Sequence, residues 1–231
     1  MNIVISGATG GVGVAAAKLF ASKGHSIILL GRDIKKLNVL TKEIIKNHKV
    51  EVSFFKCDIE DRDELSRSIK KINDLNIDLD ILINIAGIFP YGLVLDQSES
   101  VFDNCMDVNL KLPYLLSLGL FDCIKKNKGG KIINIGSSSS YSGFKNTVTY
   151  CASKHALLGL SRALNDEWRD YGVTVHCISP GTIDTEMASP LSQDSSTYIT
   201  VEEFSQLIYD VTSYSGNMIV DEVRAVRRVI R

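Results

Sequence analysis

A regular alternation of short β-branched apolar runs with longer amphipathic runs constrains the fold of this chain more than any other feature. We predict strands at Asn2–Ser6, Ser26–Leu30, Val50–Lys56, Leu79–Asn84, Lys131–Ile135 and Val173–Ser179. We predict helices that end near Lys23, begin at Ile34, and cover about 61–75, 98–127, 150–171 and 201–212. Such alternation implies parallel strands joined by right-handed crossovers. The sequence therefore predicts an α/β fold, a doubly wound parallel sheet in three α/β/α layers.

The composition fits one compact domain over residues 1–231 and leaves no room for a second. Of the 231 residues, 45% are hydrophobic, which suffices for a sizeable core. The 26 basic and 27 acidic residues give a net charge of −1 without a long block of one sign, so we expect no nucleic-acid or membrane-surface partner. No apolar run approaches the ~20 residues of a membrane span. The five cysteines show no C-x-x-C spacing and no secretion signal opens the chain, so we expect a cytoplasmic protein.

A glycine-rich turn, Ser6-Gly7-Ala8-Thr9-Gly10-Gly11-Val12-Gly13, leads from the first predicted strand into a helix. Glycines there let backbone N–H groups and the helix N-terminus approach a pyrophosphate closely. The register stays open between G-x-x-x-G-x-G and G-x-x-G-x-x-G. Packing alone, or a methyltransferase site, would also account for the turn, but its place after the first strand favours a dinucleotide. We expect cofactor contacts from Gly7, Thr9, Gly10, Gly11, Val12 and Gly13.

The second predicted strand ends at Leu30, where the adenosine ribose lies in dinucleotide-binding folds. Asp33 lies about 20 residues beyond the glycines, the distance at which an acidic residue typically binds the ribose of NAD. It also directly precedes the helical run from Ile34, and we interpret it as the N-cap of that helix. Gly31 leaves space, and Arg32 offers a planar guanidinium for a 2′-phosphate. We therefore predict NADP(H) over NAD(H).

The ends of the third and sixth strands add candidate cofactor contacts. Asp58, followed by Ile59, could accept a hydrogen bond from an adenine amino group, although Asp58 or Asp61 could equally cap the next helix. The sixth strand leads into Pro180-Gly181-Thr182-Ile183-Asp184-Thr185. We expect the backbone of Pro180-Gly181 and the hydroxyl of Thr185 to hold a carboxamide, with a plain turn as the competing account.

The end of the fourth strand carries Asn84-Ile85-Ala86-Gly87. The small Ala86 and Gly87 would let a cofactor pass near the sheet, and Asn84 could brace neighbouring backbone. A simple Asn and Gly turn would explain the same residues. Further along, Asn109 lies inside an apolar helical pattern, where a polar amide requires a partner or a function.

Tyr150 and Lys154 lie four residues apart at the head of a predicted helix, so their side chains share one face. A phenol titrates near pH ~10, and a nearby ammonium favours the phenolate. We therefore expect Lys154 to lower the pKa of Tyr150 and make it a usable general acid. Ser137 lies thirteen residues before Tyr150 at the end of the fifth strand, where its hydroxyl would face the tyrosine or belong to an ordinary polar loop.

In order and spacing these motifs resemble the short-chain dehydrogenase/reductase family, specifically its one-domain branch of 3-oxoacyl-[acyl-carrier-protein] reductases and related carbonyl reductases. The resemblance implies a Rossmann-type sheet with strand order 3-2-1-4-5-6-7, a nicotinamide cofactor, and hydride exchange between a carbonyl and an alcohol. The cofactor loop matches Ser6-Gly7-x-x-x-Gly11-x-Gly13, and the strand-four motif matches Asn84-x-Ala86-Gly87. The residues that match the family's catalytic and cofactor-ribose set are Asn109, Ser137, Tyr150 and Lys154.

The chain departs from the family pattern in a few places. Ser6 replaces the usual Thr, Ile85 the usual second Asn, and Gly136 the first Ser, which makes Ser138 a possible substitute for Ser137. The segment from Asn217 to Arg224 lacks a common glycine pair, which puts the usual C-terminal subunit contact in doubt. The family's longer, epimerase-like branch carries a C-terminal substrate domain for which this chain is too short.

The resemblance implies that Tyr150 protonates the alkoxide while Ser137 bonds the carbonyl oxygen. Lys154 would hold the nicotinamide ribose, and Asn109 would anchor a proton-relaying water. We expect a small carbonyl or alcohol substrate and a homodimer or homotetramer formed through the helices that carry Asn109 and Tyr150. A lid is expected at residues 187–200, opposite 89–95. A non-catalytic NADP-binding or regulatory protein and a methyltransferase remain the alternatives.

Overall fold

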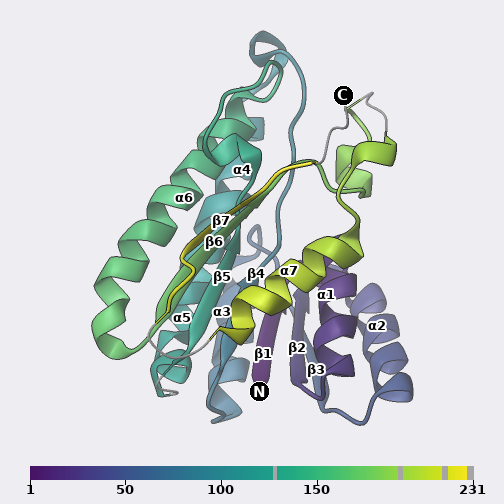
Figure 1. Cartoon of the computed structure of the whole chain (residues 1–231), viewed down its shortest axis with the longest axis vertical. Helices are drawn as coiled ribbons and strands as arrows, with labels where there is room; N and C mark the ends of the chain where they lie inside the picture. The colour runs from purple at the N-terminus through teal and green to yellow at the C-terminus, as the bar shows by residue number, and fades with distance from the viewer. Residues whose placement is uncertain (127–128, 192–194, 215–217, 228–231) are drawn as a thin grey trace.

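The computed structural model describes residues 1–126, 129–191, 195–214 and 218–227, and these contain one seven-stranded parallel sheet (Figure 1). The strands are β1 (Asn2–Ser6), β2 (Ser26–Gly31), β3 (Val52–Lys56), β4 (Ile81–Asn84), β5 (Lys131–Ile135), β6 (Thr174–Pro180) and β7 (Glu222–Ala225). Their order is β3-β2-β1-β4-β5-β6-β7, and every adjacent pair is parallel. The predicted fold class and strand order are confirmed.

Helices cover both faces of the sheet (Figure 1). They are α1 (Gly11–Ser22), α2 (Ile34–Asn47), α3 (Arg62–Asp74), α4 (Glu99–Met106), α5 (Leu112–Lys126), α6 (Val148–Trp168) and α7 (Val201–Ser213). Short 3-10 turns lie at Val94–Asp96, Ser138–Ser140, Arg169–Tyr171, Glu186–Ala188 and Ser195–Thr197. Together they give the three α/β/α layers that the sequence predicts.

Alternation along the strands assigns each side chain to one of two cores. Ile3 and Ile5 of β1 pack in the core that also contains residues of α1, α2 and α7. Val4, between them, packs in the opposite core, with residues of α3, α5 and α6. Successive strand side chains point to opposite faces, so an unbroken apolar strand serves both cores at once.

The helix predicted over residues 98–127 is wrong as a single element. The chain forms α4, then a π-helical turn at Asp107–Lys111, and then α5. The predicted third and fourth strands begin two residues too early, whereas the predicted N-cap role of Asp33 is confirmed because its carboxylate accepts from Lys36 N at 3.0 Å. These differences leave the carboxyl ends of the strands, where the motifs lie, within one residue of their predicted positions.

Neither a membrane-spanning helix nor a metal site is found among the described residues. No helix there has both the length and the apolar character needed to cross a membrane. The same ranges contain no cluster of three His, Cys, Asp or Glu side chains that could hold a metal ion.

Candidate active site

Two glycines in the turn between β1 and α1 leave no room for a side chain. Gly7 has φ +68°, and a Cβ there would lie 2.6 Å from the backbone N of Ala86. A Cβ on Gly13 would lie 2.2 Å from the carbonyl oxygen of Gly7. Val12 between them is buried. Gly7 and Gly13 are therefore needed by the fold itself, in addition to any role toward a nucleotide.

The start of α1 fits an anionic group. Its N-cap, Gly10, makes no side-chain capping bond, and the first turn carries no acidic residue. Gly10 and Gly11 are exposed, so the first backbone N–H groups of the helix face accessible space. Free donors at the positive end of the helix dipole suit a pyrophosphate.

The segment that follows β6 lies against this turn. Gly181 N donates to Ala225 O at 2.7 Å, and Asp184 N donates to Ile199 O at 2.8 Å, which fixes the segment at both ends. The methyl carbon of Thr185 would lie 3.2 Å from a Cβ on Gly11. The structure thus brings Thr185 to the glycine turn, whereas the Pro180-Gly181 turn is held against the end of β7. Part of the expected lid, residues 192–194, and Asn217 lie outside the described residues.

The end of β2 presents an exposed cation. Arg32 is exposed and has no ion-pair partner among the described residues, whereas the Asp33 carboxylate is used as the cap of α2. Thr9 Oγ1 would lie 3.5 Å from a Cβ on Gly31, so the glycine turn and the end of β2 meet here. This arrangement offers a guanidinium and a hydroxyl to a phosphate group.

The structure after β3 shows which of Asp58 and Asp61 caps the next helix. Asp61 caps α3 by accepting from Glu64 N at 2.9 Å. Asp58 instead accepts from Glu60 N at 3.2 Å in its own loop, and Ile59 is buried in the core. Asp61 is therefore the helix cap, and Asp58 forms a local turn that leaves its carboxylate at the carboxyl edge of the sheet.

Three side chains of the expected catalytic set meet at the carboxyl ends of β4 and β5. Tyr150 lies in the first turn of α6 and is 8% exposed, and its hydroxyl is hydrogen-bonded by Ser137. Lys154 Nζ donates to Ile135 O at 2.8 Å and lies 5.7 Å from the centroid of the Tyr150 ring. Ser137, and not Ser138, is the serine that contacts the tyrosine.

The expected effect of Lys154 on Tyr150 is wrong for this structure. Burial raises the pKa of Tyr150 to about 12, and the hydrogen bond from Ser137 offsets only part of that shift. Burial also lowers the pKa of Lys154 to about 8. Both shifts have one cause, because a water-poor site disfavours the phenolate and the ammonium alike. Tyr150 is therefore held protonated at neutral pH.

Asn109 is fully buried and every polar atom of its side chain has a partner. Its Oδ1 accepts from Ile88 N at 2.8 Å, and its Nδ2 donates to Ile88 O at 2.9 Å and to Ser153 Oγ at 3.0 Å. A Cβ on Gly87 would lie 3.3 Å from Asn109 Oδ1 and 3.8 Å from Lys154 Nζ. The structure thus brings all four expected catalytic residues to one place, next to Gly87.

Asn84 braces side chains and not the backbone that the sequence led us to expect. Its Nδ2 donates to Asn134 Oδ1 at 2.8 Å and lies 3.5 Å from Ser117 Oγ. Its Oδ1 is buried, and no partner for it exists among the described residues. Asn84 therefore ties β4 to β5 from within the sheet.

Sequence reasoning placed Phe89 only in a rim segment and missed its contact with Tyr150. The two ring centroids lie 4.7 Å apart with the planes at 88°. Nothing in the local sequence singles out this phenylalanine, because the contact joins the loop after β4 to α6. An aromatic residue five positions beyond Asn84 is the only available signal.

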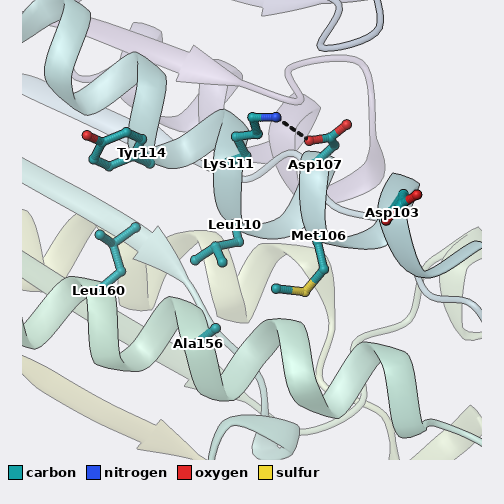
Figure 2. A pocket seen from close by; sticks show the side chains of 8 residues that line it. All are labelled: Asp103, Met106, Asp107, Leu110, Lys111, Tyr114, Ala156 and Leu160. Carbon is teal, nitrogen blue, oxygen red and sulfur yellow. Dashed lines mark ion pairs between the residues drawn. The ribbon is translucent and has the colours of Figure 1, made fainter.

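A groove lies away from these residues, on the outer side of α4, α5 and α6. It has a volume of about 690 Å³. Figure 2 shows its lining side chains between the two helical segments, with the Lys111 and Asp107 ion pair (3.2 Å) at its margin. Its lining residues are Asp103, Met106, Asp107, Leu110, Lys111, Tyr114, Ala156 and Leu160. None of them belongs to the expected catalytic or cofactor set, so the groove is a separate feature.

Comparison with known proteins gives consistent relatives. The family model described as short chain dehydrogenase matches residues 1–196. An uncharacterized oxidoreductase of Thermotoga maritima is 38% identical over 80% of this chain and 72% of its own length. The 3-oxoacyl-[acyl-carrier-protein] reductase FabG of Rickettsia conorii is 34% identical over 82% of this chain and 76% of its own length.

Solved structures share the fold over almost the entire chain. An alcohol dehydrogenase from the archaeon Thermococcus sibiricus, complexed with 5-hydroxy-NADP, has a TM-score of 0.90 at 24% identity and covers 98% of this chain and 95% of its own. A 3-oxoacyl-[acyl-carrier protein] reductase from Brucella melitensis with bound NAD has a TM-score of 0.86 at 22% identity, covering 97% and 89%. With the family model matching most of the chain, this protein belongs to the short-chain dehydrogenase family of oxidoreductases.

Proposed function

We propose that the protein transfers a hydride between NADP(H) and a small carbonyl compound or secondary alcohol, with Tyr150 as general acid and base. The observation that carries the proposal is the contact between the hydroxyls of Ser137 and Tyr150, with Lys154 Nζ alongside the same ring. A carbonyl oxygen placed at these two hydroxyls would meet a proton donor and a second hydrogen-bond donor together.

The protein's own groups supply proton control and orientation. A bound nicotinamide cofactor supplies the hydride. Tyr150 is protonated at neutral pH because burial raises its pKa to about 12, and a forming alkoxide is basic enough to accept that proton in the reductive direction. Ser137 orients the carbonyl oxygen. Lys154 would hold the ribose hydroxyls of the cofactor.

Asn109 is proposed as the fourth member of the catalytic set, after Ser137, Tyr150 and Lys154. Its contacts restrict how it can bind a water. Its side-chain amide is occupied by Ile88 and Ser153. Any water that Asn109 anchors must therefore be bound through its backbone carbonyl. That carbonyl lies in the π-helical turn Asp107–Lys111, where the usual helical hydrogen-bond pattern is shifted.

The preference for NADP(H) is proposed from the end of β2. Arg32 is available to a 2′-phosphate, and Asp33, the residue that would bind a ribose 2′-OH, is occupied as a helix cap. The pyrophosphate would lie over Gly10 and Gly11, where the start of α1 presents free N–H groups. The solved relatives contain either NADP or NAD, so the preference rests on these residues of this chain.

The proposed function is tested by following NADPH oxidation with a panel of small ketones. Tyr150→Phe should lose about 10²- to 10⁴-fold in turnover, because it removes the proton donor, while the Kd for NADPH changes little. Tyr171→Phe, exposed beyond the far end of α6, is the matched control and should behave as wild type. Tight NADPH binding with no turnover of any ketone would instead support a non-catalytic NADP-binding or regulatory protein.

We also propose that the protein forms a homodimer, or a homotetramer built from such dimers, through the groove of Figure 2. Leu110, Tyr114 and Leu160 present apolar surface there, on the helices that carry Asn109 and Tyr150. A cytoplasmic location is proposed from the five cysteines, which are all free and buried.

A further inference from the structure

The aromatic side chains beside Tyr150 form a row that runs from solvent to the buried phenol. Tyr91 is 43% exposed, Phe89 is half-buried and Tyr150 is 8% exposed. The ring centroids of Tyr91 and Phe89 lie 5.9 Å apart, and those of Phe89 and Tyr150 lie 4.7 Å apart. The row therefore links the surface to the proposed proton donor.

The row is held by contacts with the segment that precedes Tyr150. Asn146 Nδ2 donates to Tyr91 Oη at 3.3 Å, and Gly92 N donates to Asn146 O at 2.9 Å. Thr149 Oγ1 donates to Gln97 Oε1 at 3.0 Å. The loop after β4 and the start of α6 thus form one connected wall, and Phe89 is the member of that wall next to the phenol.

A substrate would meet this wall directly. If Tyr150 Oη donates to a carbonyl oxygen at the usual 2.6–3.2 Å, then the groups bonded to the carbonyl carbon lie within reach of the neighbouring ring. Aromatic rings pair favourably at centroid distances of about 4.5–7 Å, edge to face or offset. A flat unsaturated group can make that contact, whereas a saturated ring of the same carbon count is thicker and lacks the ring quadrupole.

We propose that Phe89 is a specificity-determining residue and that the preferred substrates are ketones or aldehydes with an aromatic or otherwise flat unsaturated group on the carbonyl carbon. The inference rests on the proposed reductase function and goes beyond it by naming the substrate class. No charged side chain takes part in the row, so the wall selects by shape and aromaticity.

The test compares two ketones with the same carbon skeleton, acetophenone and cyclohexyl methyl ketone, by kcat/KM with saturating NADPH. The readout is the change in the ratio of the two values between wild type and variant, because the intrinsic reactivities of the ketones cancel in it. Phe89→Leu should shift the ratio about three- to tenfold against acetophenone. Phe89→Tyr keeps the ring and should retain the wild-type ratio.

A matched control is available at the other end of the molecule. Phe121 is also half-buried and packs on Trp168, with ring centroids 4.4 Å apart. Trp168 lies eighteen residues beyond Tyr150 on α6, about 27 Å along the helix. Phe121→Leu should leave the ratio unchanged. For all variants the Kd for NADPH should stay within about twofold of wild type, which shows that the fold and cofactor site are intact.

The possible outcomes distinguish the proposed reductase function from the proposed role of Phe89 in substrate choice. An unchanged ratio in Phe89→Leu, or the same shift in Phe121→Leu, overturns the role of Phe89. Reduction of ethyl acetoacetate with no reduction of acetophenone overturns the substrate class but leaves the proposed function standing. No turnover of any of the three ketones contradicts both.

Discussion

The side-chain amide of Asn109 brackets the backbone of Ile88 on both sides, accepting from its N at 2.8 Å and donating to its carbonyl at 2.9 Å. This pair joins the helical segment between α4 and α5 to the loop that follows β4. Because Gly87 and Phe89 flank Ile88, the bracket fixes the backbone next to Lys154 and Tyr150. One buried amide therefore connects the π-helical turn to the active-site wall.

Asn109→Ala should destabilise the protein by about 2–4 kcal/mol, because it leaves the part-buried N–H and carbonyl of Ile88 without their side-chain partners and a cavity in place of the buried amide. Urea unfolding measures the change. Asn104→Ala, at an exposed position on α4, is the matched control and should change the free energy of unfolding by less than about 0.5 kcal/mol. Equal effects of the two substitutions would show that the bracket is not a significant source of stability.

Cofactor preference should depend on Arg32. Charge-assisted hydrogen bonds contribute roughly 1.5–3 kcal/mol, so wild type should bind NADPH about ten- to a hundredfold more tightly than NADH. Added salt should weaken the preference, and Arg32→Ala should remove most of it. Titration by nicotinamide fluorescence measures both affinities, with Lys145→Ala as an exposed control.

Gly31→Asp should invert the same preference, because a carboxylate repels a 2′-phosphate and accepts from a ribose 2′-OH. The backbone accepts a Cβ at this position, since it would meet Leu37 and Thr9 only at an ordinary contact distance of 3.5 Å. If wild type instead binds NADH more tightly, Asp33 is a ribose ligand, through the carboxylate oxygen Oδ2 that does not cap α2.

Lys154→Met should make the protein more stable at neutral pH, by up to about 3 kcal/mol. The pKa of Lys154 is about 8 in the fold and 10.5 ordinarily, so the unfolded chain binds more protons between these values. Wild-type stability contributed by this group therefore rises with pH across that window, and the advantage of the variant should shrink there. Tyr150 has a raised pKa, so its contribution to stability falls above pH 10. Both proteins contain Tyr150, so this contribution cancels in the difference between them.

Urea unfolding at several pH values from 7 to 10.5 measures this difference. Lys145→Met is the control, because its exposed ammonium remains in water in both states. A constant difference between wild type and Lys154→Met over the whole range would mean that burial of Lys154 does not disfavour its charge.

Gly13→Ala should destabilise the protein by about 3 kcal/mol or more, because its Cβ would lie 2.2 Å from Gly7 O and backbone must shift. Gly10→Ala is the matched control. Its φ of −83° is open to any residue and its Cβ would lie 3.5 Å from the same oxygen, so the cost should be under about 1 kcal/mol. Thermal unfolding of both variants measures the contrast, and similar Tm values would contradict the close packing of the turn.

Leu110→Asp should convert the proposed dimer to a monomer, because a carboxylate in the groove of Figure 2 would be buried without a partner. Sedimentation velocity measures the mass. Leu118→Asp, at a position of α5 that is 51% exposed and outside the groove, should leave the assembly intact. A wild-type protein that sediments as a monomer would exclude the proposed interface.

The sequence by itself determined the features that depend on a few neighbouring residues. Alternation such as Ile3, Val4 and Ile5 assigns side chains to two faces of a strand, and helix caps such as Asp33 bond to backbone three residues away. The order of strand-end motifs, matched as a set to one family, supplied the strand order and the candidate site. Those predictions needed no knowledge of which distant segments pack together.

The tertiary structure alone decided the features that arise between distant segments. The helix predicted over 98–127 contains a π-helical turn at the residue that bonds to Ile88, twenty-one positions earlier. The pKa of Tyr150 is raised and not lowered because burial outweighs every nearby group, and burial is a property of the packed fold. Phe89 reaches Tyr150 only because the loop after β4 folds against α6. Local patterns fix hydrogen bonds and side-chain faces, whereas desolvation and long-range contacts exist only once the chain is packed.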